Sequence, residues 1–387
     1  MNFAKRILEV SPSETLEITS IAKKMKQEGH DVVSMASGEP DFDTPDFIKK
    51  EAIKAIEGGF TKYTPAQGIL ELRELICQKL KKDNNLEYLP EQIVVSNGAK
   101  HSIYNIIQVL VDQGDEVLII SPYWLSYPEM VKLAQAKPII IKTVKENNYR
   151  LTPALLEQHI TKRTKLLILN SPSNPTGQVY SKEEIKQFAD VCVKHNILVI
   201  SDEIYEKIIF DNKPHISIAS LGSQINDLTI TVNGMSKSYS MTGWRIGYAC
   251  GPKAVMKAVA NLQSHATSNP CSISQKAAFC ALKNSEITKE FCRIFEKRRN
   301  LIVELMRNVS EIEYINPEGA FYLFCNISKF GLPSAEFAKK FLIEEKVAVI
   351  PGAPFGFDEF IRLSFAASES EIEKGITRLK KFICQKQ

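Results

Sequence analysis

Short apolar runs alternate with amphipathic segments through most of the chain. Residues 93–95 (IVV), 166–169 (LLIL) and 197–200 (ILVI) are rich in branched aliphatic side chains and end next to polar residues. Continuous apolar runs of this length are typical of parallel strands that are buried on both faces. The alternation of such strands with helical patterns predicts an α/β fold with a mostly parallel sheet covered by helices.

The helical segments carry recognisable start and stop signals. One helix is expected to begin at Pro45 and to stop at Gly58 and Gly59, with Ile48, Ala52, Ala55 and Ile56 on one side. Ser181 and Glu184 form a capping-box pattern that opens another helix. Its expected inner face contains Ile185, Phe188, Ala189 and Cys192.

The length of 387 residues predicts two domains, because single hydrophobic cores stop growing at roughly 250 to 300 residues. We expect a large domain over residues 45–280, which holds the strand-like runs, and a small domain over residues 281–387. Residues 1–44 are expected to join the small domain.

Composition and charge are those of an ordinary globular protein, with 44% hydrophobic and 24% charged residues. The net charge of +4 is too small to indicate nucleic-acid binding, and no basic run with interleaved aromatic residues occurs. The 8 cysteines contain no C-x-x-C pair and the 6 histidines show no ligand spacing, so neither disulfides nor a metal is expected. Neither a secretory signal nor a membrane span is apparent, and a cytoplasmic location is expected.

The segment around Lys237 is the richest in chemistry. Residues 232–248 place this lysine after an apolar run and among hydroxyl groups, glycines and Arg245, a setting that suits an amine forming a Schiff base beside an anion. Asp202 follows a predicted strand, where its carboxylate could hold a ring nitrogen protonated or could simply cap a following helix. Asn174, in a Pro-rich turn, and Tyr205 could donate hydrogen bonds to a ring oxygen, although a local Asx turn and simple packing are the alternatives.

Several segments occur in an order that is similar to a known family. These are SNGAK (96–100), SPYW (121–124), NSPSNPTG (170–177), SDEIY (201–205), MTGWRIGYACGP (241–252) and IRLSFA (361–366). Their order and spacing resemble those of fold-type I, class-I aminotransferases that depend on pyridoxal 5'-phosphate, and most closely the aspartate aminotransferase subgroup 1b. The resemblance spans nearly the whole chain and implies a large cofactor-binding domain with a seven-stranded type of sheet.

The resemblance implies specific roles in holding the cofactor. Lys237 would carry pyridoxal phosphate covalently, Asp202 would pair with the ring nitrogen, and Asn174 and Tyr205 would bind the ring oxygen, while Trp124 would stack on the ring. Catalysis would rest on Lys237, Asp202 and Tyr205. The phosphate would be bound by Gly98, Ala99, Lys100, Ser236 and Arg245, and the first N–H groups of a helix beginning near Ala99 suit an anion.

Two features bear on how complete each site is. Gly234 stands three residues before Lys237, where many members of the family have a phosphate-binding serine. Tyr63 matches a tyrosine that reaches the phosphate of the neighbouring subunit. A homodimer is therefore expected to be a functional requirement.

The family pattern also implies how substrates are bound. Arg362, in an expected strand, would anchor the α-carboxylate through its guanidinium fork, or would be an edge-strand charge. Gly38, Trp124 and Asn174 would contact the same substrate, and Lys100 would bind a distal carboxylate. Ser13 or Thr15 is expected near this pocket, whereas the effect of Glu14 on specificity cannot be derived.

Together these residues predict amino transfer from an amino acid, most simply L-aspartate, to 2-oxoglutarate by a ping-pong scheme. The alternatives are a bifunctional aspartate/prephenate aminotransferase and a carbon–sulfur lyase of the same fold. A DNA-binding regulator with this fold is disfavoured, because only 37 residues precede Gly38.

Overall fold

The computed structural model describes residues 2–11 and 14–385. Over these residues the helices and strands alternate as the apolar pattern predicts, and the α/β fold class is confirmed. The helices are α1 (Lys5–Leu8), α2 (Glu14–Gln27), α3 (Asp46–Glu57), α4 (Leu70–Asn84), α5 (Ala99–Leu110), α6 (Ser126–Leu133), α7 (Pro153–Gln158), α8 (Lys182–His195), α9 (Ser223–Asn226), α10 (Lys253–Ala266), α11 (Ser272–Lys283), α12 (Ile287–Met306), α13 (Ser334–Glu345) and α14 (Glu369–Cys384).

The main sheet contains seven strands in the described part of the chain. Their order is β2 (Ile93–Ser96), β8 (Gly247–Cys250), β7 (Thr229–Gly234), β6 (Leu198–Asp202), β5 (Thr164–Asn170), β3 (Glu116–Ser121) and β4 (Lys137–Lys142). All neighbouring strands are parallel except β8, which runs antiparallel to both of its neighbours. The register pairs Asn170 with Asp202, so these two polar residues lie side by side at the carboxyl edge of the sheet.

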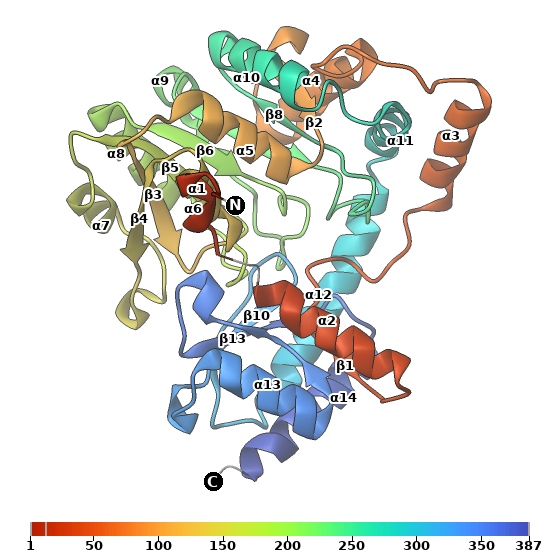
Figure 1. Ribbon diagram of the computed structural model, residues 1–387, viewed down its shortest axis with the longest axis vertical. Helices are drawn as coiled ribbons and strands as arrows, with labels where there is room; N and C mark the ends of the chain where they lie inside the picture. The colour runs from red at the N-terminus through yellow and green to blue at the C-terminus, as the bar shows by residue number, and fades with distance from the viewer. Residues whose placement is uncertain (1, 12–13, 386–387) are drawn as a thin grey trace.

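Helices cover both faces of this sheet, because each strand alternates its side chains between two apolar layers (Figure 1). Along β5, Leu166 and Ile168 pack toward α5, α6 and α10, whereas Leu167 and Leu169 pack toward α7 and α8. A third cluster forms beneath α3, α4 and α11. Burial on both faces explains why the strands read as continuous apolar runs.

The expected helix signals are largely confirmed. Ser181 caps α8 and exchanges capping-box hydrogen bonds with Glu184, and the four expected inner residues are buried. Helix α3 begins after Pro45, and Ile48, Ala52 and Ala55 are buried. Ile56, expected on the same side, is 52% exposed, so it is not part of the buried stripe.

A smaller antiparallel sheet lies below the main one, in the order β12 (Ile350–Pro351), β13 (Phe360–Ser364), β10 (Tyr322–Asn326) and β9 (Glu313–Ile315). Helices α13 and α14 accompany it, and α12 runs from the upper part of the molecule to the lower part (Figure 1). Near the amino end, β1 (Val33–Ser34) pairs with β11 (Val347–Ala348). The domain limits expected from the sequence stay a prediction.

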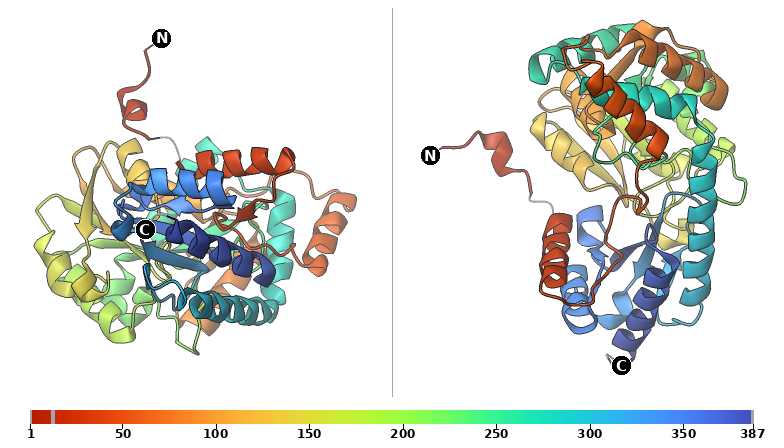
Figure 2. Two further views of the ribbon diagram at one scale, coloured as in Figure 1. Left: turned by 90° about the horizontal axis from the view of Figure 1, so that it is seen from below. Right: turned by 90° about the vertical axis from the view of Figure 1, so that its right-hand side faces the viewer.

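The first helix, α1, projects away from the body of the molecule (Figure 2). None of its residues is buried. In the described ranges, no helix combines the length and the apolar character needed to cross a membrane.

Candidate active site

A cavity of about 630 Å³ lies where the carboxyl edge of the main sheet faces the smaller sheet. Eleven of the residues that the sequence singled out line it, and they come from segments more than 300 positions apart. They are Gly38, Ala99, Lys100, Trp124, Asn174, Asp202, Tyr205, Ser236, Lys237, Arg245 and Arg362. Lys100, Lys237, Arg245 and Arg362 outnumber the two acids of the lining, Glu39 and Asp202, so the cavity favours anionic ligands.

Lys237 follows the carboxyl end of β7, and its Nζ donates a hydrogen bond to the carbonyl oxygen of Gly38 at 2.5 Å. Burial, followed by the positive charge of Arg362, lowers the pKa of this ammonium group to about 8. A lysine with this pKa supplies the neutral amine at near-neutral pH far more readily than a surface lysine does.

Asp202 ends β6 and is buried at the back of the cavity. Its Oδ2 accepts a hydrogen bond from the hydroxyl of Tyr127 at 2.7 Å, and its Oδ1 accepts one from the backbone N–H of Ile204 at 3.2 Å. Burial raises the pKa of this carboxyl to about 6. A cationic partner would restore its charge, because opposite charges favour ionised forms.

Asn174 and Tyr205 approach the same cavity from neighbouring strand ends. The Oδ1 atom of Asn174 accepts a hydrogen bond from Arg362 at 3.0 Å, so this side chain bridges distant segments and does not form a local Asx turn. Its remaining hydrogen-bonding atom is the donor Nδ2. The hydroxyl of Tyr205 lies 2.8 Å from that of Tyr322.

The start of α5 forms an anion-binding corner. Gly98 precedes the helix with a φ of +86°, and a Cβ atom there would lie 2.6 Å from Nη2 of Arg245. The first N–H groups of an α-helix have no intrahelical acceptor, so those of α5 can serve a ligand. Gly234 is also crowded, since a Cβ would meet Cα of Gly247 at 3.0 Å, and this explains why no serine stands there.

Arg362 lies in β13, between β12 and β10, so the edge-strand interpretation is wrong. Only 5% of the residue is exposed. It donates to Asn174 and to the carbonyl oxygen of Ala36 at 3.2 Å, and burial lowers its pKa. Among the described residues no carboxylate forms an ion pair with it, whereas the buried Arg298 and Arg299 pair with Asp41 and Asp211.

Lys100 and Trp124 form the side of the cavity nearest α6. The Nζ atom of Lys100 lies 4.7 Å from the centre of the Trp124 ring. Partial desolvation, with a smaller contribution from Arg245, lowers the pKa of Lys100. It is a second cation without an ion-pair partner among the described residues.

Some predicted residues do not line this cavity. Tyr63 is 90% exposed in the loop between α3 and α4. Ser13 lies outside the described residues, as do the side chains of Glu14 and Thr15.

The structure adds residues that sequence reasoning missed. Five further residues line the cavity: Thr19, Glu39, Tyr127, Thr242 and Tyr322. In the sequence, Tyr127 could have been found from its position three residues after Trp124. Tyr322 lies in the apolar stretch FYLF, which reads as an ordinary buried strand.

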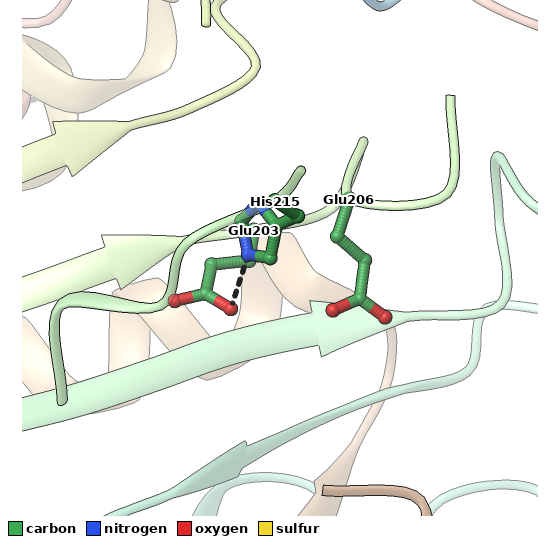
Figure 3. A group of neighbouring side chains, drawn as sticks. All are labelled: Glu203, Glu206 and His215. Carbon is green, nitrogen blue, oxygen red and sulfur yellow. Dashed lines mark hydrogen bonds and ion pairs between the residues drawn. The ribbon is translucent and has the colours of Figure 1, made fainter. Parts of the chain in front are cut away.

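A second polar cluster lies behind β6, where atoms of Glu203, Glu206 and His215 come within 4.8 Å of one another (Figure 3). Donors already satisfy both carboxylates: Ser201, Ser217, Asn84 and His215 bind Glu203, while Asn84 and Lys79 bind Glu206. The cluster is thus a hydrogen-bonded network that links the end of β6 to α4 and to the segment that carries His215.

The family model for "Aminotransferase class I and II" matches residues 30–379. The chain belongs to this family. It is a pyridoxal phosphate-dependent aminotransferase, as the resemblance implied.

Individual relatives are similar over nearly their whole length. The aspartate aminotransferase of Bacillus subtilis is 46% identical and covers 99% of both chains. The probable aspartate/prephenate aminotransferase of Aquifex aeolicus is 44% identical over 98% of both chains. Among solved structures, the aspartate aminotransferase of Thermus thermophilus with maleate has a TM-score of 0.94 and 38% identity, and covers 98% of this chain and 99% of that one.

The crowding at Gly98 leads to a first prediction. Gly98→Ala should weaken binding of pyridoxal phosphate about tenfold or more, because the added methyl group displaces Arg245. Gly114→Ala is the matched control: its φ is +90°, but nothing lies within 4 Å of the added Cβ. Cofactor titrations followed by tryptophan fluorescence compare the two variants, and equal affinities would contradict the assignment.

The lowered pKa of Lys237 leads to a second prediction. The rate at which the cofactor-free protein captures pyridoxal phosphate should rise as the pH passes about 8 and then level off, because the amine is by then neutral. Stopped-flow absorbance measures this rate. A rate that keeps rising toward pH 10.5, the ordinary lysine value, would show that the amine is not perturbed.

Proposed function

We propose that this aminotransferase moves the amino group of L-aspartate to 2-oxoglutarate, giving oxaloacetate and L-glutamate. The observation that carries the proposal is the buried guanidinium of Arg362, which has no carboxylate partner among the described residues. Burying a cation without a counter-ion is costly unless a ligand supplies the anion. The α-carboxylate common to all amino-acid substrates has the right charge and the planar fork geometry.

Lys100 supports a dicarboxylic substrate. It lines the same cavity as Arg362, with its Nζ over the Trp124 ring, and lacks an ion-pair partner in the described chain. An amino acid with a second carboxylate satisfies both cations at once. A relative whose structure was solved with maleate, itself a dicarboxylate, agrees with this charge pattern.

The donor set fits pyridoxal phosphate. Arg245, Ser236 and the N–H groups of Ala99 and Lys100 suit its phosphate, with Gly98 allowing the close approach of backbone and guanidinium. Asp202 suits the ring nitrogen, Asn174 and Tyr205 suit the ring oxygen, and Trp124 offers a stacking face. When bound, the cofactor supplies the electron sink for the negative charge that develops at the substrate Cα.

The protein's own side chains then attach the cofactor, transfer the proton and orient the substrate. Lys237 would hold the cofactor covalently. As a free neutral amine, its Nζ would accept the proton of the substrate Cα, hold it as an ammonium ion and later give it back. Arg362 fixes the substrate so that the Cα–H bond faces this amine. Asp202 would keep the ring nitrogen protonated, and Tyr205 and Asn174 would donate hydrogen bonds to the ring oxygen.

We also propose that the working unit is a homodimer in which Tyr63 of each chain completes the other chain's phosphate site. The 90% exposure of Tyr63 supports this, since an aromatic side chain gains most when a partner covers it. Other large apolar side chains are exposed as well: Ile53 and Ile56 on α3, Leu70 at the start of α4, and Phe3, Ile7 and Leu8 near the amino end. Two domains, divided near residues 45 and 280, and a cytoplasmic location remain part of the proposal.

Bifunctional activity on prephenate is the second candidate, because a relative at 44% identity is named a probable aspartate/prephenate aminotransferase. Prephenate also carries two carboxylates, so Arg362 and Lys100 suit both substrates. A substrate panel on the purified holoenzyme separates the candidates. It uses aspartate and glutamate as donors and oxaloacetate, 2-oxoglutarate and prephenate as acceptors, and release of pyruvate and ammonia would instead indicate a lyase.

Lys100→Ala should lower kcat/KM for aspartate and glutamate about tenfold to a hundredfold, while activity on alanine changes little, because only the dicarboxylic substrates lose a charged partner. Lys283→Ala is the matched control, since Lys283 lies 4.6 Å from the Phe279 ring but outside the cavity. Equal losses on all amino acids would mean that Lys100 serves the cofactor.

The dimer proposal is tested by complementation. A heterodimer of a Lys237→Ala chain with a Tyr63→Ala chain should contain one intact site and should regain up to half of the wild-type activity per dimer. A heterodimer of the Lys237→Ala chain with the double variant should stay inactive. If Tyr63 acted within its own chain, the first heterodimer would show no recovery.

A further inference from the structure

Tyr322 contacts two of the residues on which the proposed reaction depends. Its hydroxyl lies 2.8 Å from that of Tyr205, and the centre of its ring lies 4.2 Å from Cζ of Arg362. Only 1% of Tyr322 is exposed, although it lines the cavity. Tyr322 therefore uses both its hydroxyl and its ring for contacts within the site, which simple packing does not require.

The strand register explains this position. Strands β10 and β13 are antiparallel, with Phe324 opposite Arg362 and Tyr322 opposite Ser364. Side chains two positions apart share a face, so Tyr322 and Arg362 are diagonal neighbours on the face that meets the cavity. Tyr205 arrives from the other sheet, just after β6.

We propose that Tyr322 is a positioning residue for the reaction: its hydroxyl orients the Tyr205 hydroxyl toward the cofactor oxygen, and its ring holds the Arg362 guanidinium in place for the substrate carboxylate. This inference rests on the proposed function and adds to it a single side chain that serves both the cofactor end and the substrate end of the site.

The hydroxyl part follows from counting protons. Each tyrosine hydroxyl has one hydrogen to donate, and only one hydrogen can lie between the two oxygens. If Tyr322 donates to Tyr205, the hydrogen of Tyr205 is left for a ring oxygen, and the donated bond makes it a stronger donor. Burial raises the pKa of both phenols, so both keep their hydrogens over the working pH range.

The ring part follows from the surroundings of Arg362. Its guanidinium donates to Asn174 and to the carbonyl oxygen of Ala36, and its face lies over Tyr322. The ring of Phe355 lies on a second side, 5.1 Å from Cζ to the ring centre. The aromatic faces stabilise a desolvated cation that has no carboxylate partner in the described chain, and they fix the plane of its fork.

Two substitutions separate these contributions in the holoenzyme. Tyr322→Phe removes the hydroxyl and keeps the ring, whereas Tyr322→Leu removes both. Tyr180→Phe is the matched control, because Tyr180 is another buried tyrosine that accepts one hydrogen bond, from Leu151 N–H, and faces an arginine, Arg150. It does not line the cavity.

The first measurement is the pKa of the bound cofactor, obtained from its absorbance as a function of pH. Tyr322→Phe should raise this pKa by about half a unit to one unit, because a weakened hydrogen bond to the ring oxygen favours its protonated form. Tyr205→Phe should shift it further in the same direction. The Tyr205→Phe/Tyr322→Phe double variant should match Tyr205→Phe alone, since the second hydroxyl acts through the first.

The second measurement is the dissociation constant for maleate, a dicarboxylate that cannot donate an amino group. Tyr322→Phe should leave it within about twofold of the wild-type value, and Tyr322→Leu should raise it about tenfold. The KM for aspartate should likewise change little in Tyr322→Phe and rise in Tyr322→Leu. Tyr180→Phe should change neither measurement.

A Tyr322→Phe titration that coincides with the wild-type curve would overturn the hydroxyl role, and additive shifts in the double variant would do the same. Unchanged maleate binding in Tyr322→Leu would overturn the ring role. If Tyr322→Leu does not fold, the Tyr322→Phe titration still decides the hydroxyl role. A wild-type protein that binds the cofactor covalently but fails to transaminate aspartate would instead refute the proposed function.

Discussion

A buried guanidinium without a carboxylate partner in the described chain organises the substrate end of this molecule. Arg362 is held by two neutral oxygen acceptors and two aromatic rings, which orient it without cancelling its charge. The contrast with Arg298 and Arg299 is informative, since these equally buried arginines each have an aspartate. The chain itself supplies an aspartate to each of the two arginines outside the cavity. For Arg362, which lines the cavity, a ligand could supply the missing anion.

The cavity also depends on a junction between distant segments. The stretch from Gly38 to Thr44 is bound to the loop that carries Lys237: Ser240 donates to the carbonyl oxygen of Phe42, and Thr44 donates to that of Ser240. Trp244 completes the junction by donating to Thr44 at 2.8 Å. Because Lys237 itself donates to Gly38, its position is set by a segment about 200 residues away. Any displacement of the segment from Gly38 to Thr44 would therefore change the surroundings of the Lys237 amine.

The sequence predicts the polar residues of the site better than the aromatic ones, for a physical reason. Asp202 and Asn174 interrupt apolar runs at strand ends, and in parallel sheets such ends meet at one edge. Tyr322 offers no such signal, because it lies within the apolar stretch FYLF and its neighbour Arg362 belongs to a partner strand 40 positions later. Ile56 shows what periodicity cannot predict: the pattern places it on the same side as Ile48 and Ala52, but it does not tell whether a neighbouring element covers the side chain.

Burial shifts the pKa values of two ionisable groups in the cavity, Asp202 and Lys237, in opposite directions, and both shifts favour the neutral form. Burial raises the pKa of Asp202 to about 6 and lowers that of Lys237 to about 8, so the difference between acid and base is far smaller than in water. Near pH 7 both groups are still mostly charged, but each lies close enough to its pKa to lose its charge readily. A ligand that brings a cationic nitrogen to Asp202 and anionic groups to Arg245 and Arg362 would hold the acid in its ionised form and balance the cations. Lys237 would then keep an amine that accepts and releases a proton near neutral pH, and this combination is what amino transfer at a substrate Cα requires.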